Sequence, residues 1–174
     1  MDVTVQLRKE YVTMEMTARR EDNNRELRIS GARLIFKNFS GKPDKYTRDV
    51  RKFNLCLPED LARELKADGW NIKFPKDPDS DLLPRVEVIV SYRKVPPLVV
   101  QITSKHKTNL GEDEIGTLDW AEFENVDLVI RGSRWERDDG SWGIKAYLKS
   151  LYVTIKEDEF EAKYRYLDED EEED

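Results

Sequence analysis

Alternation of apolar and polar residues is the commonest pattern along this chain, and it predicts a protein built mainly from β-strands. The clearest run extends from Val86 to Tyr92, where every second side chain is apolar or aromatic. Weaker alternation occurs elsewhere, and Gly, Pro or charged residues interrupt it. We therefore predict strands over residues 3–7, 11–18, 29–39, 46–57, 70–74, 86–92, 98–102, 126–135 and 142–155.

Signals for helices and turns separate these strands. Pro58-Glu59-Asp60 predicts the start of a short helix that runs to Lys66, because proline and acids are favoured in a first helical turn. Asp139-Gly140 lies between two alternating runs and predicts a β-hairpin. A helical turn is expected at 117–123, and loops at 19–24, 75–84 and 104–111. Many short strands with one or two short helices fit a β-barrel or a β-sandwich.

The charge of the chain is concentrated at its C-terminal end. The net charge is −7, from 30 Lys and Arg against 37 Asp and Glu. Without the last seven residues the 37 acids fall to 30, so residues 1–167 are neutral. A block of like charges repels itself and predicts a disordered segment that binds protein partners. This acidic tail consists of Asp168, Glu169, Asp170, Glu171, Glu172, Glu173 and Asp174.

Composition also argues against several classes of protein. No run of 18 apolar residues exists, so we expect no membrane span, and the first residues lack the pattern of a secretion signal. One cysteine (Cys56) and one histidine (His106) give neither an intrachain disulfide nor a Cys/His zinc site. No glycine-rich nucleotide motif occurs. We therefore expect one domain with no cofactor and no metal, in the cytoplasm.

Basic and aromatic residues are interleaved between Phe36 and Phe53. This mixture is typical of single-stranded DNA binding, because cations track phosphates while rings stack on bases. The alternative, which the sequence leaves open, is that Phe36 and Phe53 lie in the core and the cations are solvated. The candidate contacts in this segment are Lys37, Phe39, Lys42, Lys45, Tyr46, Arg48 and Lys52.

A second cluster lies on the predicted C-terminal hairpin. Alternation places Ile144, Ala146 and Leu148 on one face of a strand, and Lys145, Tyr147 and Lys149 on the other. A strand with an apolar inner face and a Lys-Tyr-Lys outer face suits a sheet that presents cations and a ring to a ligand. An ordinary solvent-facing strand remains the alternative. The other candidate contacts on this hairpin are Arg131, Arg134, Trp135 and Trp142.

Three segments resemble the single-stranded DNA-binding proteins of tailed phages. They are Gly31–Gly41, followed by Tyr46 and Phe53-Asn54-Leu55; the closing strand Gly143–Val153; and the acidic end. The resemblance covers about residues 29–174 and implies an OB-type Greek-key barrel that binds DNA with little sequence preference during phage replication or recombination. It also implies that Phe39, Tyr46, Lys145 and Tyr147 contact the DNA.

The resemblance divides the chain into three parts. Residues 29–166 would form the OB domain and 167–174 the acidic tail, which would bind replication or recombination proteins. Residues 1–28 would form an extra strand or an oligomerisation arm, which leaves a homo-oligomer open. The resemblance places the protein in the cytoplasm of the bacterial host. Cellular proteins of this kind end their tails in an apolar residue, whereas this chain ends in Asp174.

Two other classes of function are weighed against DNA binding. The net charge fits an acidic DNA mimic that inhibits a host nuclease or defence complex, although a mimic needs acids spread over its folded surface. A metal-dependent nuclease would need carboxylate ligands such as Asp77, Asp79 or Glu112-Asp113-Glu114. The acids at 77–81 lack the glycine and distal glutamate of a calcium loop, which favours a solvated loop. We expect no catalytic residue.

Overall fold

The protein is built mainly from β-strands, as predicted. The computed structural model describes residues 2–9, 12–21, 25–43, 50–77 and 79–157. It contains one α-helix, α1 (Glu59–Ala67), and one 3-10 helix, η1 (Ile115–Asp119). The strands are β1 (Asp2–Lys9), β2 (Val12–Glu21), β3 (Glu26–Ser30), β4 (Leu34–Asn38), β5 (Lys52–Cys56), β6 (Ile72–Lys73), β7 (Arg85–Ile89), β8 (Leu98–Ile102), β9 (Lys107–Asn109), β10 (Phe123–Glu136) and β11 (Trp142–Ile155).

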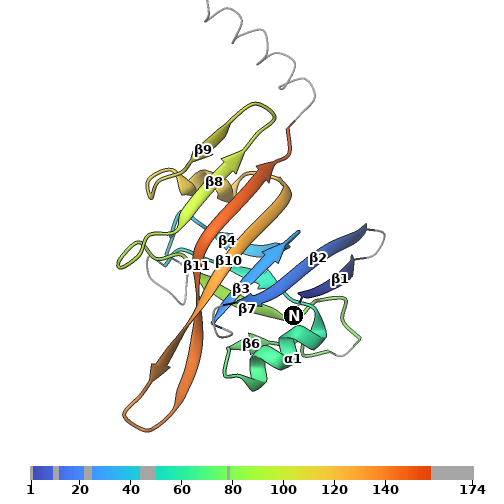
Figure 1. The fold of residues 1–174 in the computed structure, drawn as a ribbon, viewed down its shortest axis with the longest axis vertical. Helices are drawn as coiled ribbons and strands as arrows, with labels where there is room; N and C mark the ends of the chain where they lie inside the picture. The colour runs from blue at the N-terminus through green and yellow to red at the C-terminus, as the bar shows by residue number, and fades with distance from the viewer. Residues whose placement is uncertain (1, 10–11, 22–24, 44–49, 78, 158–174) are drawn as a thin grey trace, which may run out of the picture.

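One strongly twisted sheet connects these strands, in the order β1-β2-β3-β10-β11-β7-β5-β4 (Figure 1). The long strands β10 and β11 form the predicted hairpin, and β11 also pairs in parallel with β7 and then with β8. No ladder between described strands joins β4 back to β1, so the sheet stays open along one side. The architecture is that of an OB-like, partly open barrel, which confirms the predicted fold class.

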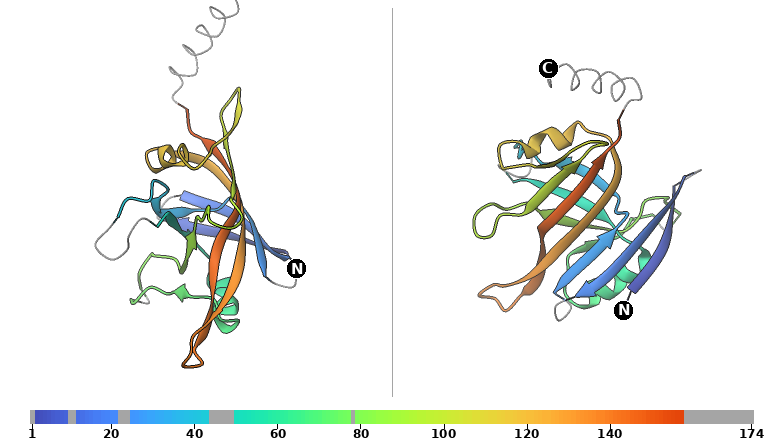
Figure 2. Two further views of the ribbon diagram at one scale, coloured as in Figure 1. Left: turned by 90° about the vertical axis from the view of Figure 1, so that its left-hand side faces the viewer. Right: turned by 45° about the horizontal axis from the view of Figure 1, so that its top comes forward.

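The core lies on the inner face of the sheet. Apolar side chains at alternate positions of β3, β5, β7, β10 and β11 are buried there, because strand residues two apart point to the same face. One end of the barrel is covered by α1, which buries Leu61, Ala62 and Leu65 (Figure 2). The helix begins after Pro58, has acids in its first turn and agrees with its prediction.

Several predicted elements differ from the structure. β2 extends to Glu21, into the loop expected at 19–24, and β5 (Lys52–Cys56) is shorter than the strand expected at 46–57. The single strand expected at 29–39 is two strands, because the chain turns at Gly31 (φ +69°) and β4 leaves β3 to pair with β5. The loop expected at 104–111 contains β9, which pairs with β8. Residues 2–9 and 12–21 form two paired strands, and β2 extends the sheet next to β3. The division into three domains remains a prediction.

Candidate nucleic-acid interface

The outer face of β11 carries the predicted Lys-Tyr-Lys pattern. Lys145 and Lys149 are exposed and Tyr147 is half-buried on this face. The hairpin register places Arg131 of β10 directly opposite Tyr147. The inner face points into the core through Ile144, Ala146 and Leu148. The predicted alternation of this strand is therefore correct.

Two adjoining hollows follow this face, and we call them together the β11 groove. Their volumes are about 610 Å³ and about 430 Å³. Ser91, Arg93 and Tyr147 line both hollows, so the two are continuous. The groove therefore runs along β11 and the segment that follows β7. Its basic and aromatic side chains are Arg51, Tyr92, Arg93, Lys94, Arg131, Lys145 and Tyr147.

Positive charge dominates the β11 groove. Among the described residues, Glu112 is the only acid that lines it, and its Oε1 lies 3.2 Å from Nη1 of Arg51. The remaining cations have no carboxylate partner in the part of the chain that the structure describes. The groove thus presents uncompensated charge to an anionic ligand. These cations are Arg93, Lys94, Arg131 and Lys145.

Two polar atoms in the groove wall lack a hydrogen-bond partner. Arg51 Nε and the Tyr92 hydroxyl are buried and make no hydrogen bond with any described residue. The Arg51 guanidinium lies 5.8 Å from the centre of the Tyr92 ring. Burial raises the pKa of Tyr92, and Glu112 acts in the same direction while Arg51 opposes it. Both atoms are shielded from solvent, so neither is a ready contact for a ligand in the groove.

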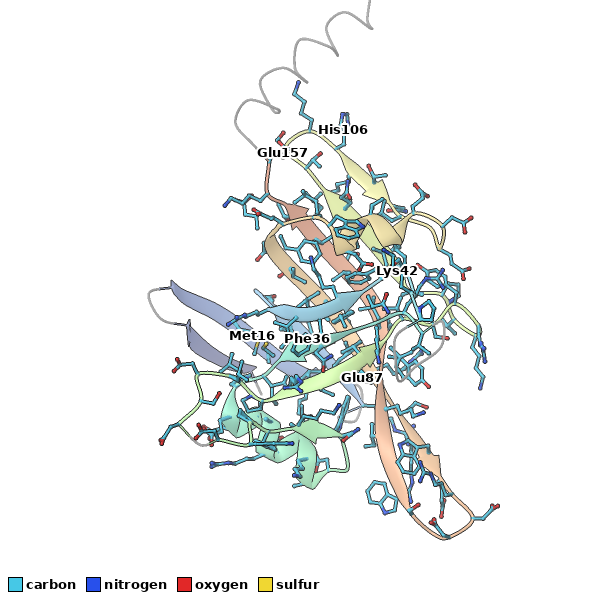
Figure 3. All side chains as sticks on the ribbon, turned by 180° about the vertical axis from the view of Figure 1, so that it is seen from behind. Met16, Phe36, Lys42, Glu87, His106 and Glu157 are labelled. Carbon is cyan, nitrogen blue, oxygen red and sulfur yellow. The ribbon has the colours of Figure 1, made fainter. Side chains whose placement is uncertain are left out.

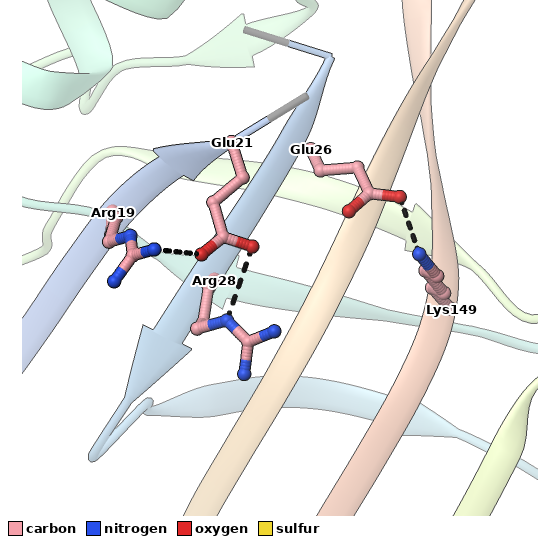
Figure 4. Close-up of polar contacts among 5 residues, drawn as sticks. All are labelled: Arg19, Glu21, Glu26, Arg28 and Lys149. Carbon is pink, nitrogen blue, oxygen red and sulfur yellow. Dashed lines mark hydrogen bonds and ion pairs between the residues drawn. The ribbon is translucent and has the colours of Figure 1, made fainter. Parts of the chain in front are cut away.

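The charges on the β2 and β3 side of this face are compensated instead. Lys149 Nζ lies 2.6 Å from Oε1 of the buried Glu26 (Figure 4). Arg19 and Arg28 both contact Glu21, at 2.9 and 3.3 Å. A cation held by a carboxylate contributes less to phosphate binding, because the pair must first be separated. Lys149 is therefore a weaker candidate than Lys145.

The predicted hairpin residues do not share one face. Arg131 and Arg134 are three positions apart, so strand alternation points them to opposite sides of the sheet. Arg134 lies 4.5 Å from the Trp142 ring on the inner side of the hairpin, whereas Trp135 is covered by Arg137 at 5.0 Å. Arg134 and Trp142 therefore lie outside the β11 groove, and with Arg131 they line a neighbouring hollow.

The predicted role of Phe39 is wrong. Its side chain is 0% exposed and packs against Phe53, with 5.4 Å between the ring centres. Its backbone N–H donates to Oδ1 of Asp119 at 2.6 Å, which ties the end of β4 to η1. A fully buried ring cannot stack on a base, so Phe39 is a core residue.

Lys37 and Lys52 are held by the protein itself. Lys37 Nζ donates to the carbonyl oxygens of Leu118 and Ala121, at 3.1 and 2.9 Å. Burial lowers the pKa of Lys37, although Asp119 opposes the shift. Lys52 lies 3.7 Å from Glu87 and is largely buried. Lys37 therefore supports the segment after η1, which corrects its prediction as a phosphate contact.

Two rings that are not among the predicted contacts are exposed. Phe36 is 67% exposed and lies 5.4 Å from the Arg85 guanidinium (Figure 3). Trp120 is 80% exposed, and Lys42 lies 5.0 Å from its ring centre. For Phe36 the sequence left both a stacking role and a core position open, and Trp120 was only one residue of a predicted turn.

Several predicted contacts lie outside the described residues. They are Lys45, Tyr46 and Arg48, together with the acidic tail at 168–174. The segment 44–49 lies between Pro43 and Val50, and Val50 lines the β11 groove.

The described residues offer little support for the metal-nuclease alternative. Within these ranges, no three His, Cys, Asp or Glu side chains gather as ligands for a metal ion. Asp77 and Asp79 are exposed, and Asp77 accepts a hydrogen bond from the backbone of Asp79. His106 lies in the turn between β8 and β9, at the same end of the molecule as Glu157 (Figure 3). No helix in the described part of the chain is long and apolar enough to cross a membrane.

An OB-like barrel with a basic, aromatic groove defines a class of nucleic-acid-binding folds. Comparison with known protein families shows to which family of this class the chain belongs. The chain belongs to the family described as "Putative phage ssDNA-binding domain", whose family model matches residues 16–174. The predicted resemblance is confirmed. A comparison with curated protein sequences found no match.

Solved structures agree with the fold. The single-stranded DNA-binding protein from bacteriophage Enc34 has a TM-score of 0.50 and 15% identity, and the alignment covers 90% of this chain and 92% of that one. Its C-terminal truncation has the same score and identity, with coverage of 89% and 96%. At this identity the likeness shows a common fold.

Proposed function

We propose that this protein binds and protects single-stranded DNA in the β11 groove, with little sequence preference, during phage DNA replication or recombination. Membership of the phage ssDNA-binding family supports the binding of single strands. The observation that carries the assignment to this groove is the ring of Tyr147 between Lys145 and Arg131, neither of which is neutralised by a carboxylate of the described chain.

The proposed mechanism is passive and involves no catalysis. A base stacks on Tyr147, which typically contributes about 1–3 kcal/mol per base. Arg93, Lys94, Arg131 and Lys145 neutralise phosphates and release counterions. Sequence tolerance follows because every base offers a flat face, whereas hydrogen bonds to base edges would select among bases. The protein therefore covers a single strand without recognising its base sequence.

Further residues extend the proposed contact. Lys42 with Trp120 forms an exposed cation–ring pair. We retain as proposals Lys45, Tyr46 and Arg48 of the 44–49 segment, and Trp135 of the hairpin. The acidic tail is proposed to bind replication or recombination proteins and to compete with DNA for the groove.

A charge reversal in the groove tests this proposal. Lys145→Glu should weaken binding of oligo-dT roughly tenfold or more at low salt, because it replaces a phosphate contact with a repulsive charge. Lys76→Glu is the matched control, since Lys76 is exposed and lines neither hollow of the groove. Gel shifts with both variants measure the difference.

The two possible failures are distinct. Equal binding by the Lys145→Glu and Lys76→Glu variants would show that the strand lies elsewhere on the protein. If the unmodified protein does not bind oligo-dT, single-strand binding itself is rejected and the DNA-mimic alternative gains support.

A further inference from the structure

A third hollow lies at the end of the barrel, between α1 and the inner side of the β10–β11 hairpin. Its volume is about 800 Å³, and we call it the end pocket. Residues from β2, the start of β3, the end of α1 and both hairpin strands line it. Its basic and aromatic side chains are Arg20, Arg25, Arg131, Arg134, Trp70 and Trp142.

The end pocket has an excess of positive charge. Asp68 is the one acid among the described residues that line it, and its Oδ2 lies 2.7 Å from Nη2 of Arg20. Arg20 also contacts Glu64 at 2.6 Å, so its charge is compensated. The other three arginines have no carboxylate partner within the described ranges. They are Arg25, Arg131 and Arg134.

A buried donor in the same wall has no acceptor. Trp70 is 3% exposed, and its indole Nε1–H makes no hydrogen bond with any described residue. The ring is held tightly, because a Cβ on Gly132 would lie 2.8 Å from its Cζ2. An unpaired buried donor is unfavourable, because it has lost its hydrogen bonds to water.

The end pocket is continuous with the β11 groove. Arg131 and Ser133 line both. The two hollows meet because β10 extends beyond its pairing with β3. The last hydrogen bond between the two segments runs from the Gly132 N–H to the Arg25 carbonyl oxygen, at 2.7 Å. Figure 1 shows the hairpin projecting past the end of β3. A polymer in the groove can therefore cross this open edge.

We propose that the end pocket binds backbone phosphates of the strand that lies in the β11 groove, after the strand crosses the edge of β10. This inference rests on the proposed function. Arg25 and Arg134 supply guanidinium groups that match pairs of phosphate oxygens. Trp142, which stacks on Arg134, closes the pocket at the hairpin. The pocket thus lengthens the binding site and bends the bound strand around β10.

An oligonucleotide length series tests this extension. The Arg25→Ala/Arg134→Ala variant should bind an oligo-dT of about 16 nucleotides roughly tenfold more weakly at low salt, and one of about 4 nucleotides as the unmodified protein does. For the long oligonucleotide, the log–log salt slope should become shallower by about 0.7 for each lost phosphate contact. Arg63→Ala is the control, because Arg63 is exposed on α1 and pairs with Glu59 outside the pocket.

Two results would overturn the inference. Unchanged binding of both lengths would show that the pocket does not contact DNA. Equal losses at both lengths would place these arginines within the primary site. Failure of the unmodified protein to bind either length would instead reject the proposed function.

Discussion

Tyr147 is the residue on which the proposed interface most depends. We expect Tyr147→Ala to weaken oligo-dT binding by about 5- to 150-fold, which corresponds to the loss of about 1–3 kcal/mol of stacking. Tyr147→Phe keeps the ring and should bind within a few-fold of the unmodified protein. Fluorescence titration with oligo-dT measures both.

Tyr152 provides the matched control for this substitution. It is an exposed tyrosine on the same strand, and it lines neither the β11 groove nor the end pocket. Tyr152→Ala should leave DNA affinity unchanged. A similar loss from both alanine variants would indicate a general effect of tyrosine removal on β11 and would argue against stacking by Tyr147.

Tyr92 should make the protein less stable at alkaline pH. Its pKa is raised in the folded state by burial, whereas an unfolded tyrosine loses its proton near pH 10. Above about pH 10 the folded state therefore binds more protons than the unfolded state, and the free energy of unfolding falls as pH rises through the raised pKa. Below about pH 10 this contribution is fully present.

Urea unfolding at pH 8 to 11 measures this effect. The unmodified protein should lose stability over the alkaline part of the range more steeply than Tyr92→Phe, which has no titrating hydroxyl. Parallel curves for the two proteins would mean that Tyr92 ionises equally easily in both states.

At the scale of single elements, β4 shows why alternation could not settle the position of Phe36. Two residues of β4, Phe36 and Lys37, oppose the single residue Phe53 of β5, which is a β-bulge. Phe36 has φ +53°, a conformation that usually favours glycine. The bulge turns Phe36 to solvent and leaves Phe39 in the core. No glycine marks this bulge in the sequence, so an analysis that assumes strict alternation does not predict it.

The long hairpin was predictable because its signals are local. Asp139-Gly140 marks the turn, and Gly140 has φ +85°. The alternation of β11 correctly assigned Lys145 and Tyr147 to the outer face. Local patterns do not show, however, that β11 pairs with β7 and thereby brings Arg93 and Lys94 beside Tyr147. The part of the groove that contains Arg93 and Lys94 therefore could not be predicted.

Gly132 allows β10 to pack closely over Trp70. An added Cβ would lie 2.7 Å from Cγ2 of Ile144 and 2.8 Å from the Trp70 ring. We expect Gly132→Ala to lower the free energy of unfolding by about 1–3 kcal/mol, as overpacked cores typically do. Urea denaturation measures the change.

Gly111→Ala is the control for this substitution, because the nearest atom to its added Cβ is a flexible Glu114 oxygen at 3.4 Å. Its effect should be much smaller. A Gly132→Ala variant as stable as the control would mean that Ile144 and Trp70 move apart without cost.

For the whole molecule, the division of charge leads to a prediction about the tail. Removing residues 168–174 takes away seven of the 37 acids and leaves a neutral chain. If the tail competes for the groove, this truncation should strengthen oligo-dT binding several-fold at low salt and have little effect at about 1 M salt, where the Debye length is about 3 Å.

A variant with Asn and Gln at these seven positions separates charge from chain length. It should behave like the truncated protein. Unchanged or weaker DNA binding after truncation would exclude competition by the tail, while the proposed groove would remain.

The parallel pairing of β11 with both β7 and β8 has a consequence for synthesis of the protein. A ribosome synthesises β7 and β8 well before residues 142–155. Until β11 is made, the edge of each strand that pairs with β11 is unpaired. Unpaired edges promote aggregation, and contacts between distant parts of a chain form slowly. The nascent protein is thus most exposed to misassembly just before its last strand emerges.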